Sequence, residues 1–234
     1  MDASLTAPRL SIVIPCLDEE EAIAGTLGAI EPLRARGAEV IVVDGGSVDA
    51  TVARAQGRAD LVLTAPRGRA SQMNAGARHA RGDVLLFVHA DTRLPQHADI
   101  LIESGLASSG KAWGRFDVRI EGNHPLLGVI AAAMNRRSRY TGIATGDQGI
   151  FVSRTLFERV GGYPAIALME DIALTTALKR HGLPLCIPEK AATSGRRWEK
   201  HGVVRTVVLM WRLRLAYRLG ADPDRLALRY AALR

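Results

Sequence analysis

The sequence of 234 residues is poor in features that would define several classes of protein. Its only two cysteines, Cys16 and Cys186, stand in apolar runs, which excludes a disulfide scaffold and predicts a cytoplasmic protein. No uncharged apolar stretch approaches the ~20 residues that a membrane-spanning helix needs. The apolar fraction of 47% is too high for a chain that is mainly disordered. A globular domain remains as the expectation.

Residues 1–195 carry no net charge. Residues 196–234 hold ten Lys or Arg and three Asp or Glu, so they account for the whole net charge of +7. The basic segment 203–220 also contains Val, Leu, Met and Trp. This mixture favours peripheral contact with an anionic membrane over nucleic-acid binding, since no nucleic-acid module accompanies it. Two alternatives stay open, a packing helix with snorkelling arginines and a face for a second subunit.

The first 95 residues alternate between short apolar runs and segments with helical spacing. Strands are predicted at residues 10–14, 40–43, 61–63 and 84–88, and helices at 18–36, 48–56 and 70–81. Strands that alternate with helices indicate an α/β fold, with a mostly parallel, doubly wound central sheet and helices on both faces.

The pattern changes after residue 95. Strands are predicted at 113–120, 149–152 and near 185, and helices at 126–139, 171–181, 203–219 and from Asp222 onward. We therefore predict two lobes on one continuous sheet, with residues 1–95 as the nucleotide-binding half and 96–202 as the acceptor and catalytic half. A basic, apolar helical segment, 203–234, follows.

Polar clusters follow the first, second and fourth predicted strands, at residues 18–21, 44–51 and 89–92. Ligands of open α/β sheets bind beyond the carboxyl ends of the strands, so the clusters predict one shared site. The first strand lacks the glycine-rich turn of a dinucleotide site, and no Walker phosphate loop is present. The acids instead favour hydrogen bonds to a base and ribose. Asp91, directly after a strand, suits Mn2+ or Mg2+ beside a diphosphate.

Several motifs together resemble glycosyltransferase family 2. They are Ser-Ile-Val-Ile-Pro-Cys-Leu-Asp-Glu-Glu at 11–20, Val-Asp-Gly-Gly-Ser-Val-Asp-Ala-Thr at 43–51 and Arg-Gly-Asp-Val-Leu-Leu-Phe-Val-His-Ala-Asp at 81–91. Gly-Asp-Gln-Gly at 146–149, Gly-Gly-Tyr-Pro at 161–164, Met-Glu-Asp at 169–171 and Arg-Arg-Trp at 196–198 follow in the family's order. The resemblance covers about residues 9–202, and the C-terminal part is similar to a small bacterial branch described as radical-SAM- or selenoprotein-associated.

The resemblance implies a GT-A fold and the transfer of a hexose, with inversion, from a nucleoside-diphosphate sugar to an acceptor hydroxyl. UDP is the expected nucleotide because it is the family's commonest. The implied nucleotide-binding residues are Pro15, Asp18, Glu19, Asp44, Ser47, Arg69, Gln72 and Asn74. For a divalent metal, Asp91 is the implied direct ligand, and His201 stands where many members have a late histidine that completes the site. His89 replaces the first acid of the Asp-x-Asp motif and is either a further metal ligand or a strand-end histidine.

The same resemblance makes Asp171 the general base, which takes the proton of the acceptor hydroxyl, and gives Glu170 an orienting role. The alternative for Asp171 is an acid that merely stabilises a helix start. Gly146, Asp147, Gln148, Arg197 and Trp198 are implied contacts of the donor sugar or the acceptor. Ser194 replaces the glutamine of the family's Gln-x-x-Arg-Trp motif, so processive synthesis is not expected.

Two other functions compete with this interpretation. A nucleotidyltransferase would carry a glycine-rich basic loop after the first strand, where this chain is acidic. A catalytically silent protein that binds nucleotide sugars or membranes is favoured only by His89, whereas Asp91, Glu170 and Asp171 favour an enzyme. The acceptor is not specified by the sequence, but the basic apolar C-terminus favours a lipid-linked acceptor and a location at the inner face of the membrane.

Overall fold

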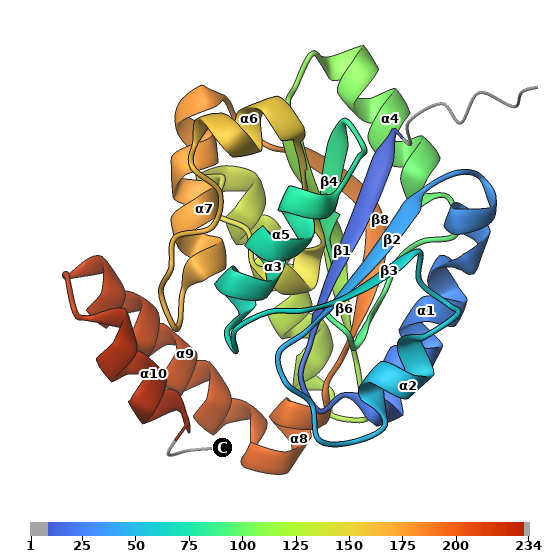
Figure 1. Cartoon of the computed structure of the whole chain (residues 1–234). Coiled ribbons are helices and arrows are strands. Elements are labelled where there is room, and N and C mark those ends of the chain that lie inside the picture. The colour runs from blue at the N-terminus through green and yellow to red at the C-terminus, as the bar shows by residue number, and fades with distance from the viewer. Residues whose placement is uncertain (1–8, 232–234) are drawn as a thin grey trace, which may run out of the picture.

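A computed structural model describes residues 9–231 of the chain (Figure 1). Its described strands form a single eight-stranded sheet, in the order β3-β2-β1-β4-β7-β6-β8-β5. Helices cover both faces of this sheet. The predicted α/β fold on one continuous sheet is therefore confirmed, although the sheet is parallel only in part.

The first half of the sheet is parallel, and its two central strands, residues 10–16 and 39–44, are buried throughout. It contains β1 (Leu10–Cys16), β2 (Glu39–Asp44), β3 (Leu61–Thr64) and β4 (Val84–Phe87), with β1 paired to both β2 and β4. Successive side chains of a strand point to opposite faces. Ile12 and Ile14 accordingly pack under α1 (Glu20–Ala35) and α2 (Thr51–Ala55), while Val13 packs under α3 (Arg69–His79).

Antiparallel pairing enters in the second half. The strand β7 (Ile150–Ser153) runs antiparallel between β4 and β6 (Trp113–Glu121), and β5 (Thr92–Arg93) runs antiparallel to β8 (Leu185–Ser194). The helices of this half are α4 (Ala98–Ser109), α5 (Leu126–Thr141), α6 (Arg154–Arg159) and α7 (Glu170–Leu178). Only a short strand was expected near residue 185. A register shift between Phe116 and Asp117 lets β8 continue through the exposed residues 188–190, Pro-Glu-Lys, which conceal it in the sequence.

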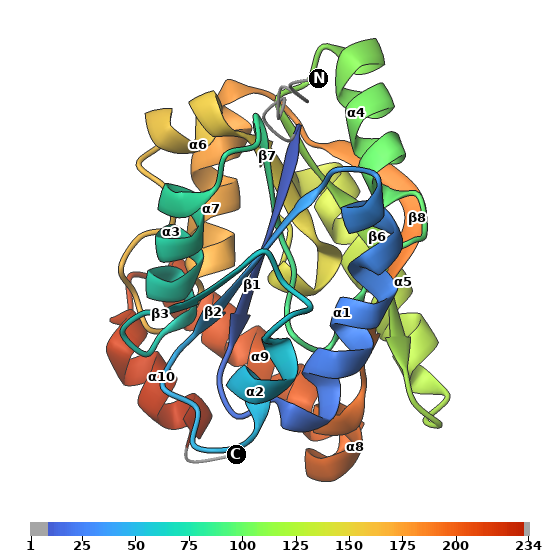
Figure 2. The same cartoon turned by 45° about the vertical axis from the view of Figure 1, so that its right-hand side comes forward.

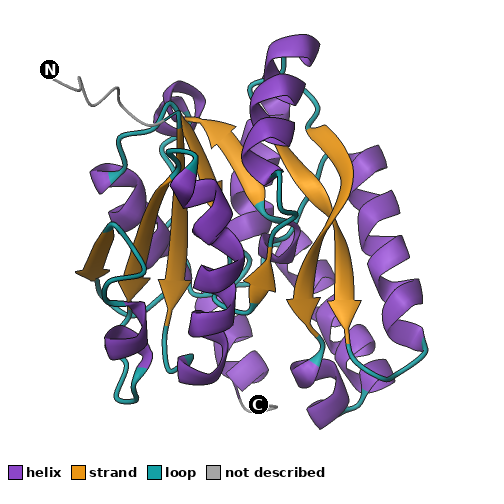
Figure 3. Ribbon diagram, turned by 90° about the vertical axis from the view of Figure 1, so that its right-hand side faces the viewer, coloured by secondary structure: helices purple, strands orange, loops and turns teal. Residues whose placement is uncertain are grey.

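The C-terminal helices lie across the edge at which β1 and β2 end (Figures 1 and 2). They are α8 (Arg196–His201), α9 (Val203–Arg218) and α10 (Pro223–Ala231). Leu213 of α9 and Leu226 of α10 form a buried cluster with Met169, the residue before α7. This cluster holds α9 and α10 beside the Glu170–Asp171 pair. Figure 3 shows the parallel strands pointing toward the same edge.

No helix in the described part of the chain is long and apolar enough to cross a bilayer.

Candidate active site

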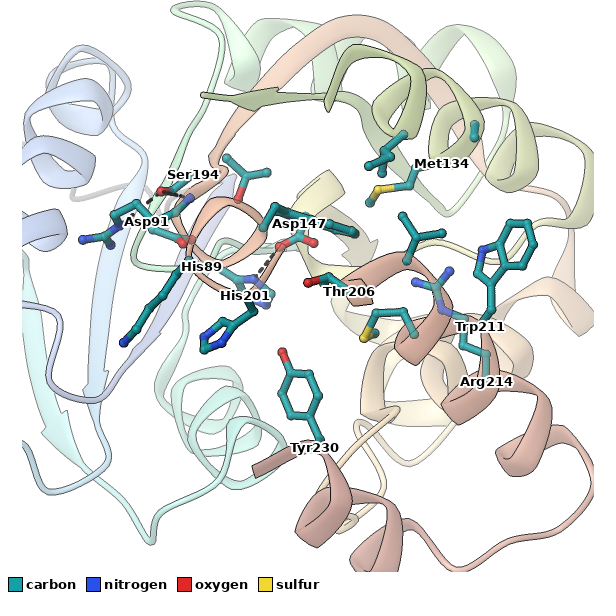
Figure 4. Close-up of a pocket in the computed structure, with 18 of the residues that line it drawn as sticks. His89, Asp91, Met134, Asp147, Ser194, His201, Thr206, Trp211, Arg214 and Tyr230 are labelled. Atoms are coloured by element: carbon teal, nitrogen blue, oxygen red, sulfur yellow. Dashed lines mark hydrogen bonds and ion pairs between the residues drawn. The ribbon is translucent and has the colours of Figure 1, made fainter. Parts of the chain in front are cut away.

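A pocket of about 820 Å³ lies between the carboxyl edge of the sheet and the helices α5, α8 and α9. One end is polar and is lined by Glu19, His89, Asp91, Asp147, Ser194, Arg196 and His201. The other end is apolar, with Val129, Ile130, Ala133 and Met134 from α5 facing Val207, Met210 and Trp211 from α9. Figure 4 shows Asp91 and Ser194 at one end of the pocket and Trp211 and Arg214 at the other. A ligand with both a polar and an apolar part suits this division.

The loops after β1 and β2 are tied to each other by predicted nucleotide-binding residues. The buried carboxylate of Asp44 accepts hydrogen bonds from the N–H groups of Gly46 and Ser47 and from the Ser47 hydroxyl. The Ser47 Oγ accepts a hydrogen bond from the N–H of Asp18 at 2.9 Å, and Asp18 Oδ1 accepts one from the N–H of Val48 at 2.9 Å. The structure therefore brings Asp18, Asp44 and Ser47 together beside Pro15, which is buried in β1.

Two further predicted nucleotide-binding residues lie on α3, and their side chains form hydrogen bonds to the protein backbone. The amide of Gln72 donates hydrogen bonds to the carbonyls of Cys16 and Val43, at 2.7 and 2.8 Å. The Asn74 side chain donates to the carbonyl of Tyr163 at 2.8 Å and accepts from its N–H at 3.0 Å. Both residues hold loops in place. Their distance in sequence from these backbone partners explains why the sequence could not reveal this arrangement.

Arg69, at the start of α3, reaches the pocket from the same side. Its side chain keeps exposed surface because it stands in the open pocket. Burial lowers the pKa of Arg69, but the charges of Glu170 and Asp147 outweigh this effect and raise the pKa. Arg69 is therefore a fixed cation facing the acidic side of the pocket.

A chain of contacts connects the end of β4 to α7 through the loop at Gly146. His89 Nδ1 lies 3.2 Å from Asp147 Oδ1, and the N–H of Gly146 donates a hydrogen bond to Asp171 Oδ2 at 3.0 Å. A Cβ at position 146 would stand only 2.3 Å from His89 Nε2, so only glycine fits there. The neighbouring Gln148 is fully buried and donates a hydrogen bond to the Ser138 hydroxyl at 3.0 Å, which fixes the loop from within.

The two acids at the start of α7 lie in different surroundings. Glu170 is buried, and burial together with the charge of Asp171 raises the pKa of Glu170, against the opposing charge of Arg69. Asp171 is half-buried and accepts hydrogen bonds from the N–H groups of Gly146 and Ile172. Asp147 lines the pocket. Asp171 lies behind it and is connected to the same loop by the hydrogen bond from the N–H of Gly146.

The three predicted metal ligands do not form a ready-made cage. Within residues 9–231, no group of three or more His, Cys, Asp or Glu side chains is arranged to hold a metal ion. Asp91 and His201 line the pocket, and His89 is engaged with Asp147. The Asp91 carboxylate, however, has no hydrogen bond or ion pair to any described residue. One free carboxylate fits Mn2+ or Mg2+ that takes its remaining ligands from substrate phosphates and water.

The sequence analysis missed two residues of the apolar end, Arg137 and Arg214. The Nε and Nη2 atoms of Arg137 and the Nε atom of Arg214 are buried without a hydrogen-bond partner among the described residues. The helical pattern gives no sign that these two arginines, among many exposed ones, point inward. Trp198 lines the pocket, whereas the side chain of Arg197 lies outside the described part of the structure. Its neighbour Arg196 pairs with Glu21 at 3.0 Å and with Glu19 at 3.7 Å.

A mixed α/β sheet with a pocket of charged side chains at its carboxyl edge is an arrangement typical of enzymes that bind nucleotides. Comparison with known families identifies the class. Residues 11–148, more than half of the chain, match glycosyl transferase family 2. The chain belongs to this family and is a glycosyltransferase, as its motifs predicted. This membership favours transfer over the nucleotidyltransferase and silent-binder alternatives.

Individual relatives extend the match beyond residue 148. The chain is 29% identical over 186 residues to an uncharacterized glycosyltransferase of Mycobacterium tuberculosis, covering 74% of this chain and 70% of that protein. It is also 29% identical over 238 residues to the probable glycosyltransferase YdaM of Bacillus subtilis, covering 91% of this chain and 55% of YdaM. The chain thus spans little more than half the length of the latter protein.

Solved structures confirm the predicted GT-A fold. Residues 1–349 of TarS of Staphylococcus aureus, in complex with UDP-GlcNAc, superimpose with a TM-score of 0.65 at 16% identity, over 80% of this chain and 58% of that fragment. The mannosyltransferase PcManGT of Pyrobaculum calidifontis, in complex with GDP-Man and Mn2+, gives a TM-score of 0.66 at 23% identity, over 97% of this chain and 70% of that one.

Proposed function

We propose that the chain moves a sugar from a nucleoside-diphosphate sugar to an acceptor hydroxyl, with inversion at the anomeric carbon. The observation that carries this proposal is the pocket at the carboxyl edge, where the loop carrying Asp91 meets the chain of contacts from His89 to Asp171. The relatives solved with UDP-GlcNAc and GDP-Man support a nucleotide-sugar donor. UDP remains the first nucleotide to test.

The nucleoside would bind at the joined loops after β1 and β2. Hydrogen bonds between the loops fix Asp18 and Ser47, and bonds within the second loop fix Asp44. Together with Pro15 at the end of β1, they would receive a base and ribose with little rearrangement. Arg69 stands over the pocket as a permanent cation and would face the donor's negative charge. Gln72 and Asn74 would support these loops from behind.

A divalent cation, Mn2+ or Mg2+, would be held by Asp91 together with oxygens of the donor diphosphate. When bound, such an ion offsets the negative charge that develops on the departing diphosphate. The support is the Asp91 carboxylate in the pocket wall, which pairs with none of the residues that the structure describes, and the Mn2+ that accompanies GDP-Man in PcManGT. His89 and His201 are the nearest candidates for further contacts.

Asp171 would act as the general base. It takes the proton of the acceptor hydroxyl while that oxygen forms a bond to the anomeric carbon. The bond from the anomeric carbon to the diphosphate oxygen breaks, and its electron pair leaves with the nucleoside diphosphate. The support is its position, because Asp171 accepts a hydrogen bond from the N–H of Gly146, beside Asp147 of the pocket wall. Asp147 would orient the sugar or acceptor.

We also propose that α9 contacts an anionic membrane surface. Val204, Val208, Trp211 and Leu215 are all exposed and recur every three or four residues, so they form one apolar stripe along the helix. Exposed Arg205 and Arg212 flank the stripe. An exposed apolar stripe bordered by cations matches the charge and polarity of an anionic lipid surface.

Nucleotide binding tests the transferase proposal directly. UDP, GDP, CDP and dTDP would be added to the full chain with Mn2+, Mg2+ or EDTA, and the thermal midpoint recorded. A ligand that binds only the native state raises the free energy of unfolding. We expect one nucleotide to raise the midpoint and EDTA to abolish the shift. If no nucleotide shifts the midpoint, the donor site is wrong.

Vesicle flotation tests the membrane proposal. Replacing both Val208 and Leu215 with Asp should abolish flotation of the full chain on phosphatidylglycerol-rich vesicles, because charged groups would have to enter the lipid interface. Leu228→Asp is the control, since Leu228 is also exposed but lies on α10, outside the stripe. Equal flotation of the double variant and the control would contradict the proposal.

A further inference from the structure

Two cations stand in the pocket wall without partners. Arg137 of α5 and Arg214 of α9 both line the pocket, and neither side chain has a hydrogen bond or ion pair to any residue that the structure describes. Three of their nitrogen atoms are fully buried. Burying charged donors without partners is unfavourable, so a fold retains such a pair where something else supplies the negative charge.

The two arginines also act on each other. Burial lowers the pKa of Arg137 to about 10, and the charge of Arg214 adds to this effect. Burial lowers the pKa of Arg214 as well. Both groups still carry a full charge at neutral pH, so two like charges are held near one another. Asp147 and Asp171 are the acids within electrostatic range, and they are engaged with His89 and Gly146. No acid among residues 9–231 is paired with either arginine, so both can bind an anionic ligand.

The surroundings of the arginines are apolar. Ala133 and Met134 of α5 face Val207 and Met210 of α9 in the same half of the pocket. This apolar passage reaches the surface at Trp211, whose exposed fraction is 70%. Trp211 belongs both to the pocket wall and to the exposed stripe of α9. A chain that entered from the stripe would therefore meet apolar side chains first and the arginines inside.

We propose that Arg137 and Arg214 bind the phosphate group of an amphipathic acceptor whose apolar chain lies between α5 and α9. The inference rests on the proposed transferase function and names the acceptor class for it. The donor diphosphate is the other phosphate in the reaction. It is placed elsewhere by the geometry, because Arg214 lies at the end of the pocket opposite Asp91 and Ser194 (Figure 4). Asp171, within electrostatic range of both arginines, would then meet the acceptor's hydroxyl.

The test measures binding of octyl phosphate to the full chain by calorimetry, with inorganic phosphate and octyl glucoside as comparisons. Each comparison compound lacks one of the two parts that the subsite recognises. We expect octyl phosphate to bind about tenfold or more tightly than either, since charge-assisted hydrogen bonds and buried methylenes each contribute. Saturating UDP should leave this binding within about twofold, because the donor occupies the other end of the pocket.

Paired variants then locate the subsite. Replacing both Arg137 and Arg214 with Gln should weaken octyl phosphate binding about tenfold or more, and leave UDP binding within about twofold. The matched control replaces Arg136 and Arg218 with Gln. These arginines are on the same two helices and the charge change is the same, but both are exposed and neither lines the pocket. The control should bind octyl phosphate like the unmodified protein.

Met210→Glu provides an independent variant if the double replacement does not fold. It introduces a carboxylate into the apolar end of the pocket, where it can pair with the arginines and should compete with the phosphate to a similar extent.

Several outcomes would overturn the inference. Unchanged binding in the arginine variant would remove the subsite. Loss of UDP binding in step with octyl phosphate binding, or displacement of octyl phosphate by UDP, would assign the arginines to the donor diphosphate. Equal binding of inorganic phosphate would point to a small soluble acceptor. A failed transferase proposal looks different, because the unmodified protein would then bind no nucleotide whatever its affinity for octyl phosphate.

Discussion

Glu39 and Glu170 are equally buried, with 5% of each side chain exposed, yet their pKa values are displaced in opposite directions. Burial alone would raise the pKa of Glu39, but hydrogen bonds from Ser11 and Arg81 outweigh it and lower the pKa. At Glu170 the opposing charge of Arg69 is too weak, and burial together with Asp171 raises the pKa. The surroundings of Glu39 therefore stabilise its ionised carboxylate, whereas the surroundings of Glu170 oppose its ionisation.

The same contrast separates the two regions around these residues. In the parallel half of the sheet, Asp44, Gln72 and Asn74 all direct their side chains to backbone groups of the protein. At the pocket, Arg137 and Arg214 are left without partners in the described part of the chain. Polar groups that stabilise the fold are satisfied within it, whereas polar groups that serve a ligand are satisfied only when the ligand binds.

The largest effect is expected at Asp171, beside the pocket. Asp171→Asn should lower the rate of sugar transfer about 10²- to 10⁴-fold, because the acceptor hydroxyl loses its proton acceptor. Donor binding, measured by calorimetry, should stay unchanged because the asparagine keeps the shape of the side chain. Asp147→Asn is the comparison, since both acids flank Gly146. If Asp147→Asn abolishes transfer while Asp171→Asn remains active, the base is Asp147.

The next largest effect is expected at Glu39, in the parallel half of the sheet. Glu39→Ala should lower the free energy of unfolding by about 2–3 kcal/mol, because it leaves the Ser11 hydroxyl and the N–H of Arg81 without their acceptor. Urea unfolding measures the change. Glu31→Ala, which removes an exposed glutamate from α1, should have almost no effect. Equal losses in the two variants would mean that the network around Glu39 contributes nothing.

A smaller effect is expected at the metal site. Asp91→Ala should weaken nucleotide binding about 10- to 100-fold in the presence of Mn2+, the range in which metal-site changes commonly act. In EDTA, the variant and the unmodified protein should bind alike, because no ion then connects the carboxylate to the diphosphate. The exposed Asp83 serves for the control substitution Asp83→Ala. An affinity loss that persists in EDTA would give Asp91 a role independent of metal.

The smallest effect concerns the pH dependence of stability. Because the pKa of Glu170 is raised in the folded state, its contribution to stability is fully present below the ordinary glutamate pKa and is lost as the pH rises through the raised value. Glu170→Gln stays neutral and escapes this loss. The variant should therefore gain stability over the unmodified protein at pH 8 but not at low pH, in thermal melts without ligand. A constant difference at all pH values would contradict the raised pKa.

The sequence predicted the parallel half of the fold closely, because each strand there is a continuous apolar run between helices with regular spacing. It did less well where the pattern is interrupted. Strand β8 contains the exposed stretch 188–190, so only its start was predicted. Helix α4 follows β5, a strand of only two residues, and neither of these two elements was predicted.

For the site, the motifs predicted which loops would meet but not which side chains would face the ligand. Asp91, Asp147 and Trp198 line the pocket, whereas Gln72, Asn74 and Gln148 are bonded to distant parts of the protein. Those bonds depend on tertiary contacts that local sequence does not encode. Arg137 and Arg214 escaped notice for the same reason, because their burial depends on how α5 and α9 pack.

The close contact between Gly146 and His89 has a consequence for how these two positions evolve. The imidazole occupies the space that a side chain at position 146 would need, so neither residue can change freely without the other. We expect relatives that carry a smaller acid at the position of His89 to tolerate a side chain at the position of Gly146, and relatives that carry histidine to keep glycine. The two positions should then vary as a pair across the family, a signature that an alignment of many sequences would display.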